Sequence, residues 1–367
     1  MNSHLRYICY AGVSIGVFYA TTASALDITK STDAVRKTVS GTTANLACSS
    51  LSPFYWEIGN KNGTVIHGTG GTPKPGYKSA PDPYSGTDRT LNIASASKLV
   101  FGAYVVQRRA GNLSKEDLKY LEMTSGYPGI AADSAGYTFT GCGIFQTVGG
   151  CFNNKGHNNV HDSNLDGKFN YGGGHFQAFA ALPEAQGGLN IGANFDAGLA
   201  NQINSTLGAG THFSYSNPGL AGGGQSTVTN YTQFLQAIVS GNLLLMKSFL
   251  GYKPVCTAGE LCPHALSAGT PVRVPYNNQL VTLKWHYSVG HWVEDDPNSP
   301  LLNQFGAKVG DDNAYSSPGV FGFYPWIDHS KTYYGVVARE DWAKGAYINS
   351  ALCGKLIRKA WFSGNPQ

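Results

Sequence analysis

The pattern of apolar and polar positions predicts strands near both ends of the chain and helices between them. Apolar runs over 54–58 and 64–67 flank Asn62-Gly63, a dipeptide that favours a tight hairpin turn. Two more strand-like runs fall at 319–323 and 333–338. Because the terminal runs can pair with one another, the pattern favours an α+β fold. One antiparallel sheet then forms from the two ends, with a mostly helical lobe inserted between them.

Helical spacing of apolar residues marks the middle of the chain. In the segment 93–109 the apolar positions recur at intervals of three and four, and Gly111 suits the residue after the helix end. Ser114 and Asp117 form a capping pair at the start of the next predicted helix. Further helices are predicted at 194–207, 229–250 and 346–361, the second of them interrupted near Gly241. The segments 69–90, 137–175 and 252–281 read as loops or irregular structure.

The first 25 residues read as a secretory signal. Arg6 precedes an apolar run over 7–20, and Ala23-Ser24-Ala25 supplies small residues for cleavage. A membrane anchor is the competing interpretation, but the run is short for a span, and no later stretch is long and apolar enough. We therefore expect a secreted or periplasmic protein with one domain over 26–367 and a lobe inserted at about 112–300.

Cysteine usage agrees with export. Without Cys9, which lies in the signal, six cysteines remain, and an even number in an exported chain suggests disulfides. The preferred pairs are Cys142 with Cys151, Cys256 with Cys262, and Cys48 with Cys353, out of fifteen possible connectivities. A zinc site is the alternative, but the spacings lack the C-x-x-C pairs of structural zinc.

Charge argues against nucleic-acid partners. The chain has 26 Lys and Arg against 22 Asp and Glu, and no basic run is dense. His157, His161 and His175 suggest a metal only weakly, because no H-E-x-x-H pattern accompanies them. The segment 162–167 begins like a calcium loop, yet Gly173 stands where the bidentate Glu belongs. We expect no metal and no cofactor.

Ser95 and Lys98 carry the strongest chemical signal. A hydroxyl and an amine three residues apart share one face of a helix. A serine at a helix start also lies near unpaired backbone N–H groups, which stabilise negative charge. The pair can therefore make a nucleophile without a histidine.

Four segments in order resemble the serine β-lactamase and penicillin-binding-protein superfamily, in particular its class C β-lactamase-like branch, which includes many esterases. They are Ile93–Leu99, Leu121–Tyr127, Leu207-Gly208 with Thr211, and Leu220–Gly224 with the following Ser226-Thr227 and Tyr231–Phe234. This resemblance implies a β-lactamase/transpeptidase-like fold.

The branch carries a second motif with a tyrosine, for which two candidates exist. Tyr171 lies in Phe169–Gly174, and Tyr215 lies in Phe213–Asn217, which matches the Y-x-N letters better. The motif tyrosine of the branch precedes the other downstream segments, and Tyr171 does so. We therefore prefer Tyr171 and keep Tyr215 as the alternative.

The third motif of the branch best fits Ser317, Pro318 and Gly319. The family usually has Lys or His at the first of these positions, where the cation holds the substrate carboxylate. Ser317 cannot do this, so the resemblance points to an esterase or amidase more than to a β-lactamase. Pro318 is tolerated at a sheet edge.

The implied mechanism is acylation of Ser95. Lys98 either takes the proton as a neutral amine, or stays charged and lowers the pKa of Tyr171, which then acts as general base. The backbone N–H groups of Ser95 and Val320 form the oxyanion hole by carry-over from the branch. Three hypotheses follow: a hydrolase of a small-molecule ester or amide, a β-lactamase or D-Ala-D-Ala carboxypeptidase acting on peptide-like substrates, and a non-catalytic binding protein. The sequence gives no oligomeric state.

Overall fold

The computed structural model describes most of the chain. The described residues are 26–42, 47–129, 142, 147–153, 160–208, 210–258, 273–276, 279–297 and 311–367. The predicted signal over 1–25 lies outside these ranges, as do Cys262 and His157. Within the described ranges, no helix has the length and hydropathy of a membrane span.

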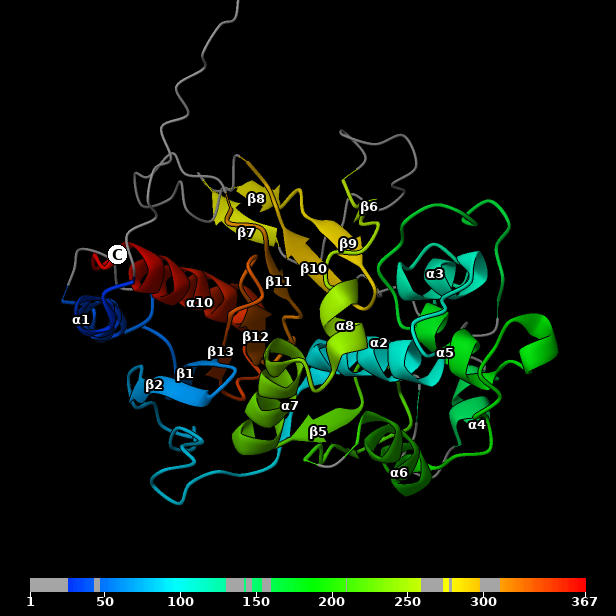
Figure 1. The fold of residues 1–367 in the computed structure, drawn as a ribbon, viewed down its shortest axis with the longest axis horizontal. Coiled ribbons are helices and arrows are strands. Elements are labelled where there is room, and N and C mark those ends of the chain that lie inside the picture. The colour runs from blue at the N-terminus through cyan, green and yellow to red at the C-terminus, as the bar shows by residue number, and fades with distance from the viewer. Residues whose placement is uncertain are drawn as a thin grey trace, which may run out of the picture.

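A central eight-stranded antiparallel sheet joins the two ends of the chain (Figure 1). In β1 and β13, Tyr55 lies opposite Ala338, so strands almost 280 residues apart are neighbours. The α+β class predicted from the sequence is confirmed. In order across the sheet, the strands are β2 (Gly63–Gly70), β1 (Phe54–Asn60), β13 (Tyr333–Ala338), β12 (Tyr324–Ile327), β11 (Ala314–Ser316), β10 (His291–Glu294), β9 (His286–Ser288) and β6 (Val255–Cys256).

The two faces of the sheet build two cores. Side chains alternate along β1, so Tyr55 enters the larger core while Trp56 enters the smaller one. The smaller core lies under α1 (Ile28–Ser40) and α10 (Ala346–Ser363), which pack together on one side of the sheet (Figure 1). The larger core fills the opposite side, between the sheet and the helical part of the molecule.

The helical part holds the remaining helices and a small sheet (Figure 1). Its helices are η1 (Ala94–Ala96), α2 (Ser97–Arg108), α3 (Lys115–Leu121), α4 (Val148–Phe152), α5 (Gly174–Ala181), η2 (Glu184–Gln186), α6 (Asp196–Leu207), α7 (Val228–Ser240) and α8 (Leu244–Phe249). A small sheet in the order β3 (Leu91–Asn92), β5 (Gly224–Ser226), β4 (Ser214–Tyr215) and a hairpin of β7 (Arg273–Tyr276) with β8 (Gln279–Thr282) complete the described fold. Helix α2 is buried over most of its length, and Lys98 in its first turn is one of the buried residues.

Local sequence signals locate several elements correctly. The β1–β2 hairpin turns immediately before Gly63, where φ is 114°. Ser114 and Asp117 form the predicted capping box of α3. Gly241, with φ of 91°, ends α7 and separates it from α8. In each case a side chain or a glycine satisfies a backbone requirement of its own segment, so the local sequence is enough to predict it.

Several predictions about elements are wrong, including the loop predicted over 137–175, which contains helix α4. The chain starts its described part with helix α1, not with a strand; the apolar signal of α1 is diluted because Ser31 and Thr38 are also buried on its inner face. The segment 319–323 is a turn, because Gly322 has φ of 92° and donates its N–H to the Gly319 carbonyl. Pro318 therefore follows β11 and is not part of a strand.

The irregular segment predicted at 252–281 contains β6, β7 and β8. In addition, β6, β9 and β10 join the main sheet, although their residues fall inside the range expected for the inserted lobe.

Two predicted disulfides are present. Cys48 bonds to Cys353 of α10, and Cys142 bonds to Cys151 of α4. Cys256 is also disulfide-bonded, while its predicted partner Cys262 lies outside the described residues. The first bond ties the segment before β1 to the C-terminal helix, across 305 residues of sequence.

Candidate active site

Ser95 lies in a single 3₁₀ turn, η1, that leads into α2. Ala94, directly before it, has φ of 46°, a conformation that is uncommon for a residue with a Cβ. Ser95 is partly exposed, whereas Ala94 and Ala96 on either side are fully buried. The strained turn therefore presents this one hydroxyl from an otherwise buried segment, as is common where a reacting group must face a cleft.

Lys98 reaches Ser95 one turn further along. Its Nζ donates to Ser95 Oγ at 2.9 Å and to the Ala221 carbonyl at 2.7 Å. The Nζ also lies 4.7 Å from the centre of the Tyr171 ring, over its face. The serine–lysine contact predicted from the spacing is therefore present in the structure.

The surroundings of Lys98 disfavour its charge. The side chain is 4% exposed, and no carboxylate forms an ion pair with it in the described part of the chain. Burial lowers the pKa of Lys98 from 10.5 to about 7. The amine can therefore accept a proton near neutral pH, which an exposed lysine cannot.

Tyr171 belongs to an aromatic wall beside Lys98. Its ring stacks on Trp292 of β10 at 5.3 Å between centroids and meets Tyr287 of β9 edge-on at 6.0 Å. Trp292 and Tyr287 are both buried. The main sheet thus holds Tyr171 against the lysine from behind.

The glycines after Tyr171 let the chain pass close to a neighbouring loop. A Cβ on Gly172 would lie 1.7 Å from the Pro128 carbonyl oxygen, and one on Gly174 would lie 2.4 Å from the Gly129 nitrogen. A Cβ on Gly173 would meet only the Ala221 Cβ, at 3.6 Å. The close approach at Gly172 therefore fixes the path of the backbone next to Tyr171.

The alternative tyrosine occupies another environment. Tyr215 is buried in β4, opposite Gly224, and burial raises its pKa. Among the described contacts, none joins Tyr215 to Ser95 or Lys98. The structure brings Tyr171, and not Tyr215, to the serine–lysine pair.

The third-motif residues contact the nucleophile segment directly. Ser317 is buried and donates its hydroxyl to the Ser95 carbonyl at 2.9 Å. A Cβ on Gly319 would lie 2.2 Å from the Ile93 carbonyl oxygen, so this position requires glycine. Val320, the next residue, lies partly exposed at the turn. The end of β11 is therefore anchored against the turn that presents Ser95.

Sequence reasoning missed two contributors to this site. The Ala221 carbonyl holds Lys98; its segment was noted for its family resemblance, but no signal linked it to the lysine. Trp292 supports the Tyr171 ring by stacking on it. Both contacts join segments more than 100 residues apart, so no local pattern could reveal them.

The described histidines do not form a metal centre. His175 is buried, with Nδ1 2.8 Å from Ser125 Oγ and Nε2 2.9 Å from the Asn170 carbonyl, and burial lowers its pKa to about 4. No group of three His, Cys, Asp or Glu side chains suited to a metal occurs among the described residues.

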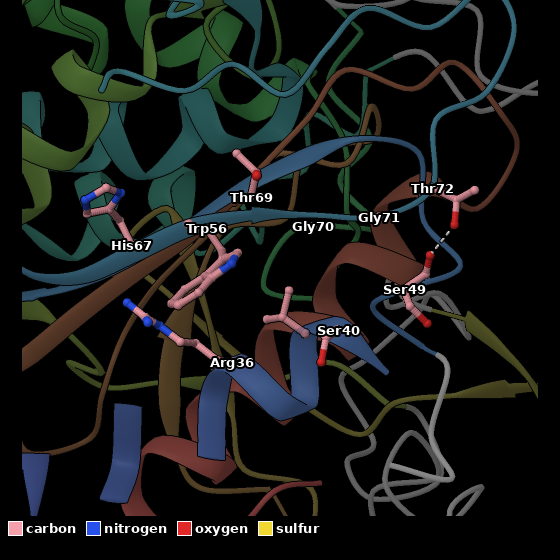
Figure 2. Close-up of a pocket in the computed structure, with 11 residues that line it drawn as sticks. Arg36, Ser40, Ser49, Trp56, His67, Thr69, Gly70, Gly71 and Thr72 are labelled. Atoms are coloured by element: carbon pink, nitrogen blue, oxygen red, sulfur yellow. Dashed lines mark hydrogen bonds between the residues drawn. The ribbon is translucent and has the colours of Figure 1, made fainter. Parts of the chain in front are cut away.

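A separate cavity of about 580 Å³ lies between α1 and β2 (Figure 2). Arg36 and Ser40 of α1 and Trp56 of β1 line it, and the Thr72 hydroxyl donates to the Ser49 carbonyl at its edge. Trp56 belongs to the smaller core, on the α1 side of the sheet, so this cavity is distinct from the Ser95 site.

Comparison with solved structures identifies the fold. The hydrolase EstCE1, which has promiscuous acyltransferase activity, matches with a TM-score of 0.56 and 11% identity, covering 92% of this chain and 100% of that chain. A D-amino acid amidase from Ochrobactrum anthropi SV3 matches with a TM-score of 0.53 and 10% identity, covering 90% and 98%. A protein from Bacteroides dorei DSM 17855 assigned to the β-lactamases matches with a TM-score of 0.53 and 17% identity, covering 85% and 94%.

No family model matches the chain, and no curated protein matches its sequence. The chain has the serine β-lactamase-like fold, as the resemblance in its motifs predicted. This is a fold that hydrolases and an amidase use.

Proposed function

We propose that this protein is an exported serine hydrolase that cleaves a small ester or amide through an acyl-enzyme on Ser95. The observation that carries the proposal is the contact of the half-buried Ser95 hydroxyl with a lysine whose burial lowers its pKa to about 7. The fold shared with a hydrolase and an amidase supports it.

In the first step, Ser95 Oγ bonds to the acyl carbon while its proton passes to Lys98, directly or through Tyr171. The bond from the acyl carbon to the alcohol or amine then breaks, and the proton goes to that leaving group. A water molecule next attacks the acyl-enzyme, which releases the acid and restores the Ser95 hydroxyl. The N–H groups of Ser95 and Val320 stabilise the oxyanion in both steps; each such donor typically lowers the barrier by about 2.7–4 kcal/mol.

The residues at the third motif favour an ester or amide without a carboxylate at that position. Ser317 donates its hydroxyl to the Ser95 carbonyl, so it anchors the nucleophile segment and offers no cation. The disulfides between Cys48 and Cys353 and between Cys142 and Cys151 support an oxidising compartment outside the cytoplasm.

Labelling with a fluorophosphonate probe, read together with p-nitrophenyl acetate turnover, tests the proposal. The wild type should be labelled and active, and Ser95→Ala should lose both. Ser248→Ala is the matched control, because the Ser248 hydroxyl is exposed and donates to the Leu244 carbonyl of its own helix α8, and it should keep both activities. Rapid cephalosporin turnover with little esterase activity would favour a β-lactamase instead, and a folded wild type that is neither labelled nor active would indicate a binding protein.

A further inference from the structure

An exposed aromatic pair lies beside the turn that follows the third motif. Trp342 is 69% exposed, the highest value among the exposed large hydrophobic side chains of the described residues. Its ring lies 3.9 Å from that of Phe321, centroid to centroid, at an interplanar angle of 46°. Phe321 is partly exposed, so the two rings together offer one apolar surface on which a flat ring can stack.

Several contacts hold this pair next to the Ser95 segment. Phe321 follows Val320 directly, and its carbonyl accepts the N–H of Asp341 at 2.8 Å. Asn92, three residues before Ser95, donates its amide to the Glu340 carboxylate at 2.7 Å. Both aromatic residues therefore belong to segments that are hydrogen-bonded to each other and to the strand leading into Ser95.

The chemistry around this pair suits an aromatic group. The carboxylate of Glu340 accepts from Asn92, and the guanidinium of Arg339 donates to Asp341, so these charges are used within the protein. Stacking on Trp342 would cover apolar surface that is now open to water, which favours binding of a flat apolar ring. Lys344, two residues further on, is exposed and is the neighbouring charge that a carboxylated substrate would use.

We propose that Trp342 and Phe321 form a subsite for an uncharged aromatic group of the ester or amide substrate. This role of the two rings rests on the proposed hydrolase function. It defines the substrate class as aryl esters or amides, or as esters or amides of arylalkanoic acids. Trp342 supplies the open ring face, and Phe321 fixes that ring beside the residue proposed to stabilise the oxyanion.

The test compares kcat/KM of the wild type and of Trp342→Ala on three esters. Phenyl acetate has the ring in its leaving group, ethyl phenylacetate has it in the acyl group, and ethyl acetate has none. The ratio of variant to wild type on each ester cancels its intrinsic reactivity. We expect about a tenfold loss on at least one aromatic ester and no change on ethyl acetate.

Two further variants make the result specific. Trp342→Phe keeps a ring and should retain most of the activity on the aromatic ester. Phe195→Ala removes an aromatic side chain that is 54% exposed on the N-terminal side of α6, and should change none of the ratios.

Equal losses on all three esters, or none on any, would overturn the subsite while leaving the hydrolase function intact. Preference of the wild type for monophenyl succinate over phenyl acetate would overturn the uncharged class and point to Lys344. Absence of turnover together with absence of fluorophosphonate labelling would reject the hydrolase function, and the subsite with it.

Discussion

In the proposed mechanism, the protonation of Lys98 decides whether Ser95 can react. Its folded pKa is lowered from 10.5 to about 7, so the amine is charged below pH 7 and neutral above it. Acylation of Ser95 by a non-ionising ester should therefore rise through pH 7 and level off near pH 8, as measured by the pre-steady-state burst. Lys98→Arg should be inactive at every pH, because a guanidinium does not release its proton.

A burst rate that is constant from pH 6 to pH 9 would contradict this role for Lys98. The circular dichroism spectrum of Lys98→Arg is the control, since it separates loss of the base from loss of the fold.

Replacing either candidate tyrosine by phenylalanine should have a different effect on kcat. Tyr171→Phe removes the hydroxyl and keeps the ring that Lys98 Nζ lies over and that stacks on Trp292, so the fold should persist. We expect kcat to fall by about 10²–10⁴-fold, the usual contribution of a general base. Tyr215→Phe is the matched control and should change kcat by less than about threefold. The reverse order in steady-state assays would return the role to Tyr215.

At the scale of elements, the glycine run after Tyr171 links the packing of this segment to the proposed role of Tyr171. In Gly172→Ala the added Cβ would lie 1.7 Å from the Pro128 carbonyl, so the backbone at Tyr171 must move. We expect a loss of about 1–3 kcal/mol in stability and a marked loss of activity.

Gly173→Ala is the neighbouring control, because its Cβ meets Ala221 at an ordinary 3.6 Å. Urea unfolding and esterase assays on both variants check this. Similar behaviour of the two variants would show that the close approach at Gly172 does not position Tyr171.

Elements were predictable where one residue satisfies a backbone requirement of its own segment. Ser114 caps α3, and Gly241 ends α7, with no help from the rest of the fold. The segment 319–323 reads as a strand from its apolar letters, yet the close contact of Gly319 with the Ile93 carbonyl and the positive φ of Gly322 make it a turn. That contact depends on a segment more than 200 residues away, which periodicity cannot detect.

At the scale of the whole molecule, the Cys48–Cys353 disulfide joins the two ends of the described fold. It closes 305 residues of sequence, whereas Cys142–Cys151 closes nine. In the chain-entropy model the longer loop gives the larger stabilisation, about 5.7 kcal/mol against about 2.6 kcal/mol.

Replacing Cys48 and Cys353 by Ala should therefore lower the urea midpoint more than replacing Cys142 and Cys151. The two double variants serve as controls for each other, because each removes one disulfide. A larger effect from the shorter loop would show that the bond between the chain ends does not dominate.

The contacts of the candidate site also differ in how far the sequence alone predicts them. The Ser95–Lys98 contact follows from spacing along one helix, so the sequence alone predicts it. The order of motifs favours Tyr171 over Tyr215, and Lys98 Nζ lies over the Tyr171 ring in the structure. The role of Tyr171 as the base stays a prediction. The Ala221 carbonyl, the Trp292 support and the Ser317–Ser95 bond depend on how distant segments pack, which only the fold determines.

Identification of the acylated residue tests the central claim most directly. The protein is incubated with a fluorophosphonate, digested, and the modified peptide is sequenced by mass spectrometry. We predict one adduct, on Ser95, which is absent both in Ser95→Ala and in Lys98→Arg. An adduct on any other residue, or one that persists in Ser95→Ala, would contradict it.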